Sequence, residues 1–78
     1  MNDLLTVKNI CVDCDGWTKR DASFERLKNE IADAGHVVTT IKLRGAEVKQ
    51  GGGSLKRLIV DVTCETVDGA VWVKLALG

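Results

Sequence analysis

Two cysteines three positions apart are the residues of this sequence with the most obvious chemistry. Cys11 and Cys14 form a C-x-x-C pair where an apolar, β-rich segment at 4–12 meets a turn at Asp15-Gly16. A thiol close to the start of a helix feels the positive end of the helix dipole, which lowers its pKa and favours the nucleophilic thiolate. Dithiol redox chemistry is therefore one interpretation, although nearby carboxylates such as Asp13 raise a thiol pKa and so oppose it.

The third cysteine does not complete a metal site. Zinc prefers four ligands, and His36 is the only histidine in the sequence. The chain order places His36 and Cys64 at the end of the expected sheet opposite to Cys11 and Cys14, so the four side chains cannot form one tetrahedron. We expect no metal and no cofactor, and we interpret Cys64 as a small buried apolar residue.

The segment after the C-x-x-C pair has the pattern of an amphipathic helix over 18–34. Thr18 is a candidate N-cap with Asp21 three residues later, and Gly35 is a candidate C-terminal stop. Apolar side chains recur at helical spacing between these ends, at Phe24, Leu27, Ile31 and Ala34.

Beyond the helix the apolar residues alternate with polar ones, which predicts strands at 36–44, 57–64 and 70–77 after a first strand at 4–12. Residues 1–78 then form one α+β domain in the order β-α-β-β-β. We expect a four-stranded mixed sheet with one helix packed on one face. The first two strands should be parallel and joined by a right-handed crossover.

This layout resembles the selenoprotein W-like members of the thioredoxin fold, which also place a C-x-x-C after the first strand of a β-α-β-β-β core. The resemblance implies that Cys14 or Cys11 is a redox thiol and that the other cysteine resolves it. The sequence departs from the pattern of thioredoxin folds because it contains no proline.

A sheet of four strands is wider than the single helix expected to cover it. Strands spaced by about 4.8 Å make a sheet some 15–19 Å across, whereas a helix is about 10 Å wide. Half of the apolar face would need another cover, which predicts a partner protein or a homodimer formed through the sheet. The alternative is that sheet twist and the long glycine-rich loop close the gap. On the opposite face we expect Trp72 near Ile59, as an interface anchor.

Basic residues gather around the connection between the second and third expected strands. This connection, about 45–56, contains Gly51-Gly52-Gly53-Ser54 and predicts a flexible hairpin loop or, alternatively, an engineered linker. A mobile basic arm suggests nucleic-acid binding through phosphates, and the alternative is an ordinary solvated hairpin end. The cations of this stretch are Lys42, Arg44, Lys49, Lys56 and Arg57, opposed only by Glu47.

The composition limits the function classes. The 78 residues carry a formal net charge of zero and an odd number of cysteines, three. They have no signal-peptide pattern and no membrane-length apolar run, so we expect a cytoplasmic protein with reduced thiols. No catalytic constellation is present, which makes an enzyme the less favoured class.

Our leading hypothesis is a small protein-interaction module that acts as an inhibitor or adaptor and occludes a partner protein. In size and lack of motifs the chain is similar to phage-encoded inhibitors such as anti-CRISPR proteins. The dithiol redox protein and nucleic-acid binding through the basic hairpin are the alternatives. The partner-binding residues that we expect are Lys42, Arg44, Lys49, Lys56, Arg57, Ile59, Trp72 and Lys74.

Overall fold

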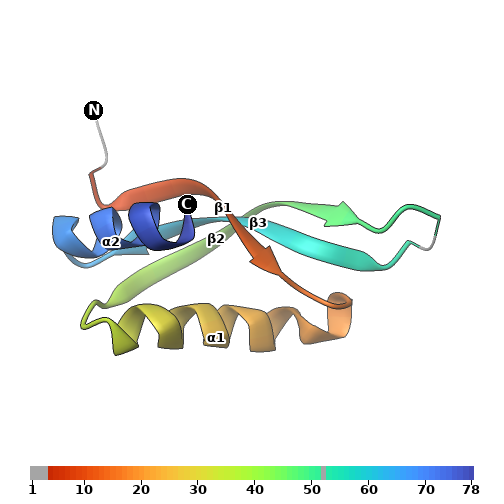
Figure 1. The fold of residues 1–78 in the computed structure, drawn as a ribbon, viewed down its shortest axis with the longest axis horizontal. Helices are drawn as coiled ribbons and strands as arrows, with labels where there is room; N and C mark the ends of the chain where they lie inside the picture. The colour runs from red at the N-terminus through yellow and green to blue at the C-terminus, as the bar shows by residue number, and fades with distance from the viewer. Residues whose placement is uncertain (1–3, 52) are drawn as a thin grey trace.

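A computed structural model of the chain describes residues 4–51 and 53–78. Three strands and two α-helices follow one another in the order β-α-β-β-α (Figure 1). The elements are β1 (Thr6–Asp13), a 3₁₀ turn η1 (Trp17–Lys19), α1 (Arg20–Asp33), β2 (Val38–Val48), β3 (Leu55–Cys64) and α2 (Val67–Leu77).

The strands form a single sheet in the order β1-β3-β2, in which β3 runs antiparallel to both neighbours. Because β1 and β2 are both antiparallel to β3, they are parallel to each other, and α1 connects them across the inserted strand β3. The expected four-stranded mixed sheet with one helix is therefore wrong. In the described residues the sheet has three strands, each pair of neighbouring strands is antiparallel, and there are two α-helices.

The error lies in the last segment, where residues 70–77 form most of α2 and not a fourth strand. The helix starts at an N-cap, Thr66, whose hydroxyl oxygen accepts a hydrogen bond from the backbone N–H of Gly69 at 3.2 Å. Ala70, Val73 and Leu77 have the i, i+3, i+7 spacing of a helix face, although the same segment also alternates with period two. A short apolar run fits both periods, and packing against the sheet selected the helix.

The first helix lies where the sequence predicts it, with a different start. Its N-cap is Lys19, which makes no side-chain cap, so Thr18 does not cap α1 and instead belongs to η1. The helix ends before Gly35, as the sequence predicts. Gly35 has a φ of 88°, its N–H donates to the Ala32 carbonyl, and the N–H of His36 donates to the Ile31 carbonyl. These paired bonds are the Schellman motif, which needs a residue that adopts positive φ without strain.

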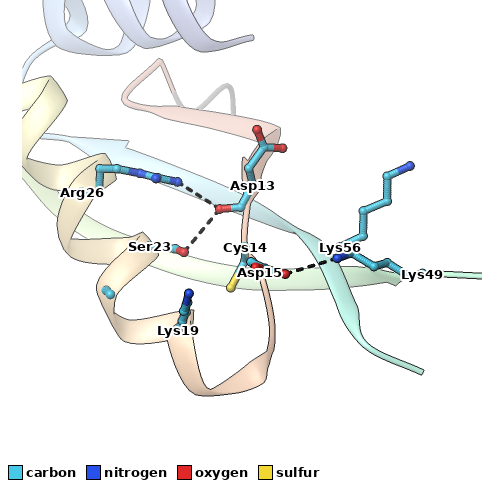
Figure 2. Close-up of a pocket in the computed structure, with 9 residues that line it drawn as sticks. Asp13, Cys14, Asp15, Lys19, Ser23, Arg26, Lys49 and Lys56 are labelled. Carbon is cyan, nitrogen blue, oxygen red and sulfur yellow. Dashed lines mark hydrogen bonds and ion pairs between the residues drawn. The ribbon is translucent and has the colours of Figure 1, made fainter. Parts of the chain in front are cut away.

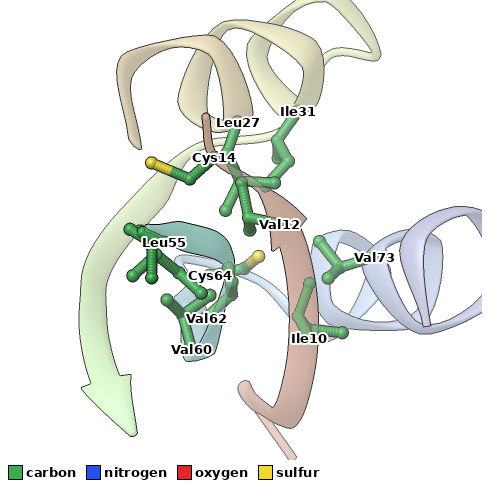
Figure 3. Packing of buried hydrophobic residues seen from close by; sticks show 11 residues of the cluster. Ile10, Val12, Cys14, Leu27, Ile31, Leu55, Val60, Val62, Cys64 and Val73 are labelled. Carbon is green, nitrogen blue, oxygen red and sulfur yellow. The ribbon is translucent and has the colours of Figure 1, made fainter. Parts of the chain in front are cut away.

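Both helices cover the same face of the sheet, and the core lies between these two layers (Figure 3). Side chains of β3 form its centre, with α1 and α2 contributing Leu27, Ile31 and Val73. The centre of the apolar face is therefore covered within one chain, and the expected half-uncovered sheet is wrong because α2 covers part of the face that α1 does not reach. The β3 residues at 0–1 % exposure are Leu55, Leu58, Val60, Val62 and Cys64.

The hairpin of β2 and β3 extends past the helices at one end of the molecule (Figure 1). The molecule measures 40 × 28 × 18 Å. The strands continue to Val48 and from Leu55, so the connection is shorter than the loop expected at about 45–56. The N–H of Lys49 donates to the Ser54 carbonyl at 2.7 Å and closes the turn. Within the glycine tract of this turn, Gly52 lies outside the described residues.

Candidate functional site

The two thiols of the C-x-x-C pair are held apart by the strand that carries them. Cys11 is exposed on β1, whereas Cys14 is buried against the core and donates its Sγ hydrogen to the Gly16 carbonyl at 3.2 Å. The N–H of Cys14 also bonds to the Lys56 carbonyl, so the extended pairing with β3 continues through this residue. Three residues of extended chain span about 10 Å between Cα atoms, beyond the roughly 7 Å that a disulfide bridges. The geometry therefore does not favour dithiol chemistry.

The third cysteine lies at the other end of the sheet together with His36. A Cβ on Gly69 would be 3.1 Å from the Cβ of Cys64 and 3.2 Å from the Cβ of His36, so these residues adjoin one another beneath α2. Burial raises the pKa of the Cys64 thiol. Within 4–51 and 53–78, no group of three His, Cys, Asp or Glu residues is arranged to hold a metal ion.

The residues expected to bind a partner do not form one surface. The sheet face that the helices leave open carries Arg57 and Ile59, which alternate with buried core residues along β3. Lys42 lies on the same face, because it pairs with Asp61 of β3. Trp72 lies on α2, where its ring centroid is 6.1 Å from that of His36. The expected position of Trp72 beside Ile59 is therefore wrong, since residue 72 is helical and belongs to the covered side of the sheet. Lys74 also lies on α2 and so on the covered side of the sheet, away from the hairpin cations, which are Lys42, Arg44, Lys49, Lys56 and Arg57.

Acidic partners engage three of the five hairpin cations. Arg44 Nε lies 3.3 Å from a carboxylate oxygen of Asp61, which is almost buried. Two further pairs are more exposed: Arg57 with Glu47 at 3.5 Å, and Lys49 with Asp15 at 3.2 Å. Exposed pairs contribute little stability, but they lower the local excess of positive charge that a phosphate backbone would attract. From the sequence, only Glu47 counts as an opposing charge in this stretch. Sequence reasoning missed Asp61, which strand pairing brings to Arg44, and Asp15, which comes from a segment distant in the sequence.

A charged cleft of about 540 Å³ lies between the start of α1 and the turn end of the hairpin (Figure 2). The side chains of Ser23 and Arg26 both donate to the backbone carbonyl of Asp13, at 3.3 and 3.1 Å, and tie α1 to the end of β1. Lys49 meets Asp15 at the other side of the cleft. The cleft walls thus carry both signs of charge, and the side chains of Ser23, Arg26, Asp15 and Lys49 have partners within the protein. The lining residues are Asp13, Cys14, Asp15, Lys19, Ala22, Ser23, Arg26, Lys49 and Lys56.

The feature that the sequence analysis missed is an apolar line along the outer side of α2. Val67, Val71 and Leu75 are exposed and spaced four residues apart, so they lie one above the other on the side of α2 opposite its buried residues. Leu75 is 82 % exposed, the highest value among the large apolar side chains described. We call these three residues the α2 ridge. The i, i+4, i+8 spacing was visible in the sequence, but the strand interpretation of 70–77 concealed it.

A groove of about 520 Å³ runs between the α2 ridge and the first part of β1. Its walls are mostly apolar, and among the described residues that line it the charged side chains are those of Lys8 and Lys74. We call this the α2 groove. It brings Lys74, one of the expected partner-binding residues, next to exposed apolar side chains, whereas the hairpin cations lie elsewhere. Its lining is Leu4, Thr6, Val7, Lys8, Asn9, Ile10, Val67, Ala70, Val71, Lys74 and Gly78.

No protein-family model, no curated protein and no solved structure matches this chain. Neither α-helix in the described part of the chain has the length and apolar character needed to span a membrane.

Proposed function

We propose that this protein is a small protein-binding module, an adaptor or an inhibitor, and that it contacts its partner through the α2 groove and the α2 ridge. The supporting observation is the clustering of exposed apolar side chains. Eight large apolar side chains are exposed in the described residues, and four of them adjoin this one surface: Leu4, Val67, Val71 and Leu75. Scattered apolar residues are normal on a monomer, whereas a contiguous apolar patch with a polar border marks an interaction site.

The energetics support the same surface. Burying an aliphatic side chain such as valine or leucine contributes about 1.5–3 kcal/mol, and interface energy is concentrated in a few well-packed central residues. The α2 ridge supplies three such side chains on a helix whose other face is fixed in the core by Ala70 and Val73. A rigid apolar surface loses little conformational entropy when it binds.

The dithiol and nucleic-acid interpretations receive no comparable support. The extended backbone separates Cys11 from Cys14, and three of the five hairpin cations have acidic partners. A protein-binding function needs neither feature.

The test replaces the exposed apolar residues and leaves the core untouched. Protein carrying Val71→Glu and Leu75→Glu should keep its fold, because both side chains point to solvent. In affinity capture from the source cells followed by titration with the purified partner, we expect binding to weaken about tenfold or more.

A matched control carries the same added charge on the other helix. Asn29→Glu with Ala32→Glu places two carboxylates on exposed positions of α1, away from the α2 groove. This control should bind the partner like the unmodified protein. Equal binding by the α2 double variant would contradict the proposal, as would recovery of the unmodified protein without any partner.

A further inference from the structure

We infer that the element of the partner that occupies the α2 groove is an amphipathic α-helix whose apolar face is bordered by acidic side chains. This inference rests on the proposed function and specifies the chemistry of the partner. It follows from three features of the groove: the irregular backbone of β1, the spacing along α2, and the sign of the charges in the lining.

The edge of β1 is poorly suited to receive an extended peptide. Among the described strands, β1 pairs with β3, and an additional strand would need regular backbone pairing along the other edge of β1. The register with β3 shifts between Val7 and Ile10, where β1 carries one residue more than β3. Asn9 in this bulge has a φ of 61°, and its N–H donates to the Asp61 carboxylate at 3.3 Å. A bulge twists the edge away, and a charged side chain such as that of Lys8 hinders strand addition.

The α2 ridge, in contrast, matches the surface of another helix. Residues four apart form the ridge that packs into the groove of a neighbouring helix, and they are about 6 Å apart along the axis. Val67, Val71 and Leu75 form such a row over two full turns of α2. A partner helix with apolar residues at i, i+3, i+4 and i+7 would interdigitate with this row and lie along the α2 groove.

The charges of the groove favour one sign of charge on the side chains that border the apolar face of that helix. Lys8 stands on β1 and Lys74 on α2, both exposed, and none of the described residues that line the groove has an acidic side chain. Asp68, the acidic residue of the first turn of α2, is not among the lining residues. An ion pair between one exposed lysine and a carboxylate of the partner would strengthen binding by up to about fivefold. Basic side chains at the flanks of the partner helix would be repelled.

The test uses three synthetic peptides of about four helical turns. The first has the amphipathic leucine pattern with glutamate flanks, the second replaces each glutamate with lysine, and the third rearranges the composition of the first into strict apolar–polar alternation. Fluorescence anisotropy gives the affinities, and amide chemical shifts locate the contact. We expect the first peptide to bind about threefold to tenfold more tightly than the second, more tightly than the third, and at the α2 ridge.

A charge reversal on the protein makes the test specific. Lys8→Glu with Lys74→Glu should invert the order of the first two peptides. Lys19→Glu with Lys28→Glu makes the same change in net charge at exposed positions beside and on α1, and it should preserve the order.

Several results would overturn the inference. These are equal binding of the first and third peptides, an order that charge reversal leaves unchanged, binding away from α2, or no binding by any peptide. Light scattering that shows a dimer, dissociated by Val71→Glu, would identify a second copy of this chain as the occupant and would also overturn it. The proposed function is judged separately, because a natural partner lost from the Val71→Glu, Leu75→Glu variant would uphold it even if the peptides fail.

Discussion

At the scale of single residues, Cys64 shows how its position in the fold decides the chemistry of a side chain. The thiol is 1 % exposed at the end of β3, next to Gly69 of α2. Burial disfavours the charged thiolate, which raises the pKa of Cys64 above its ordinary value of 9.0. Cys11, of the same residue type, is exposed on β1.

This difference predicts a loss of stability in alkaline solution. The unfolded chain releases the Cys64 proton near its ordinary pKa of 9.0, whereas the folded chain retains it to higher pH. The folded state then binds more protons than the unfolded state. The contribution of Cys64 is therefore fully present below about pH 9 and is lost as the pH rises through the raised pKa of the folded state. Urea unfolding across this range measures the free energy. Cys64→Ala should give a shallower decline, and an identical slope in the two proteins would contradict the assignment.

At the scale of elements, α2 is defined by a close approach to the sheet as much as by its own sequence. Gly69 lies in its first turns and is buried, with the Cβ atoms of Cys64 and His36 at 3.1 and 3.2 Å from the site of an added Cβ. Both neighbours are Cβ atoms fixed to the backbone and cannot rotate away. The glycine therefore lets the helix pack closely against the end of β3, and an added Cβ would require these neighbours to move by a few tenths of an ångström.

Two opposing effects make Gly69→Ala informative. In an exposed helix, alanine is about 1 kcal/mol more favourable than glycine. At position 69 the added methyl group would overpack the contact, a change that typically costs about 1–3 kcal/mol. We expect a net loss of stability, measured by thermal or urea unfolding. Ala76→Gly, at an exposed position of the same helix, isolates the propensity effect. A stabilised Gly69→Ala protein would show that α2 does not approach the sheet this closely.

At the scale of the whole molecule, α2 serves both as a cover for the core and as an exposed surface. Val73, on the inner side of α2, is fully buried, whereas Val71, two positions earlier, is half exposed. The helical turn sends these side chains to different sides, one into the core and the other to the α2 ridge.

The same substitution at these two positions should separate folding from binding. Val73→Asp places a carboxylate in the core, at a cost of several kcal/mol that approaches the total stability of a small domain. We expect an unfolded chain by circular dichroism. Val71→Asp should change the free energy of unfolding by less than about 1 kcal/mol while it weakens partner binding. A folded Val73→Asp protein would contradict the placement of α2 over the core.

The sequence predicted those parts of the fold that rest on local signals. The helix period between Phe24 and Ile31, with Gly35 as its stop, located α1 to within two residues. The alternation of Leu58, Val60 and Val62 identified the core face of β3. In β2, register shifts next to Val38, Gly45 and Val48 break the alternation, and no local pattern announced them.

The candidate site was less accessible from sequence. Of the residues expected to bind a partner, only Lys74 lines the α2 groove, because the segment around Trp72 was interpreted as a strand. The acidic partners of Arg44 and Lys49, which weaken the nucleic-acid interpretation, come from other elements.

The amino-acid sequence by itself determined the α+β character of the chain, the amphipathic helix after the first strand and the core face of β3. Tertiary structure decided whether residues 70–77 became a strand or a helix, because an apolar run of that length satisfies both periods and only contact with the sheet separates them. That decision closed the core with α2 instead of leaving it open. It also placed exposed apolar side chains on the outer side of a helix, where we propose that a partner binds.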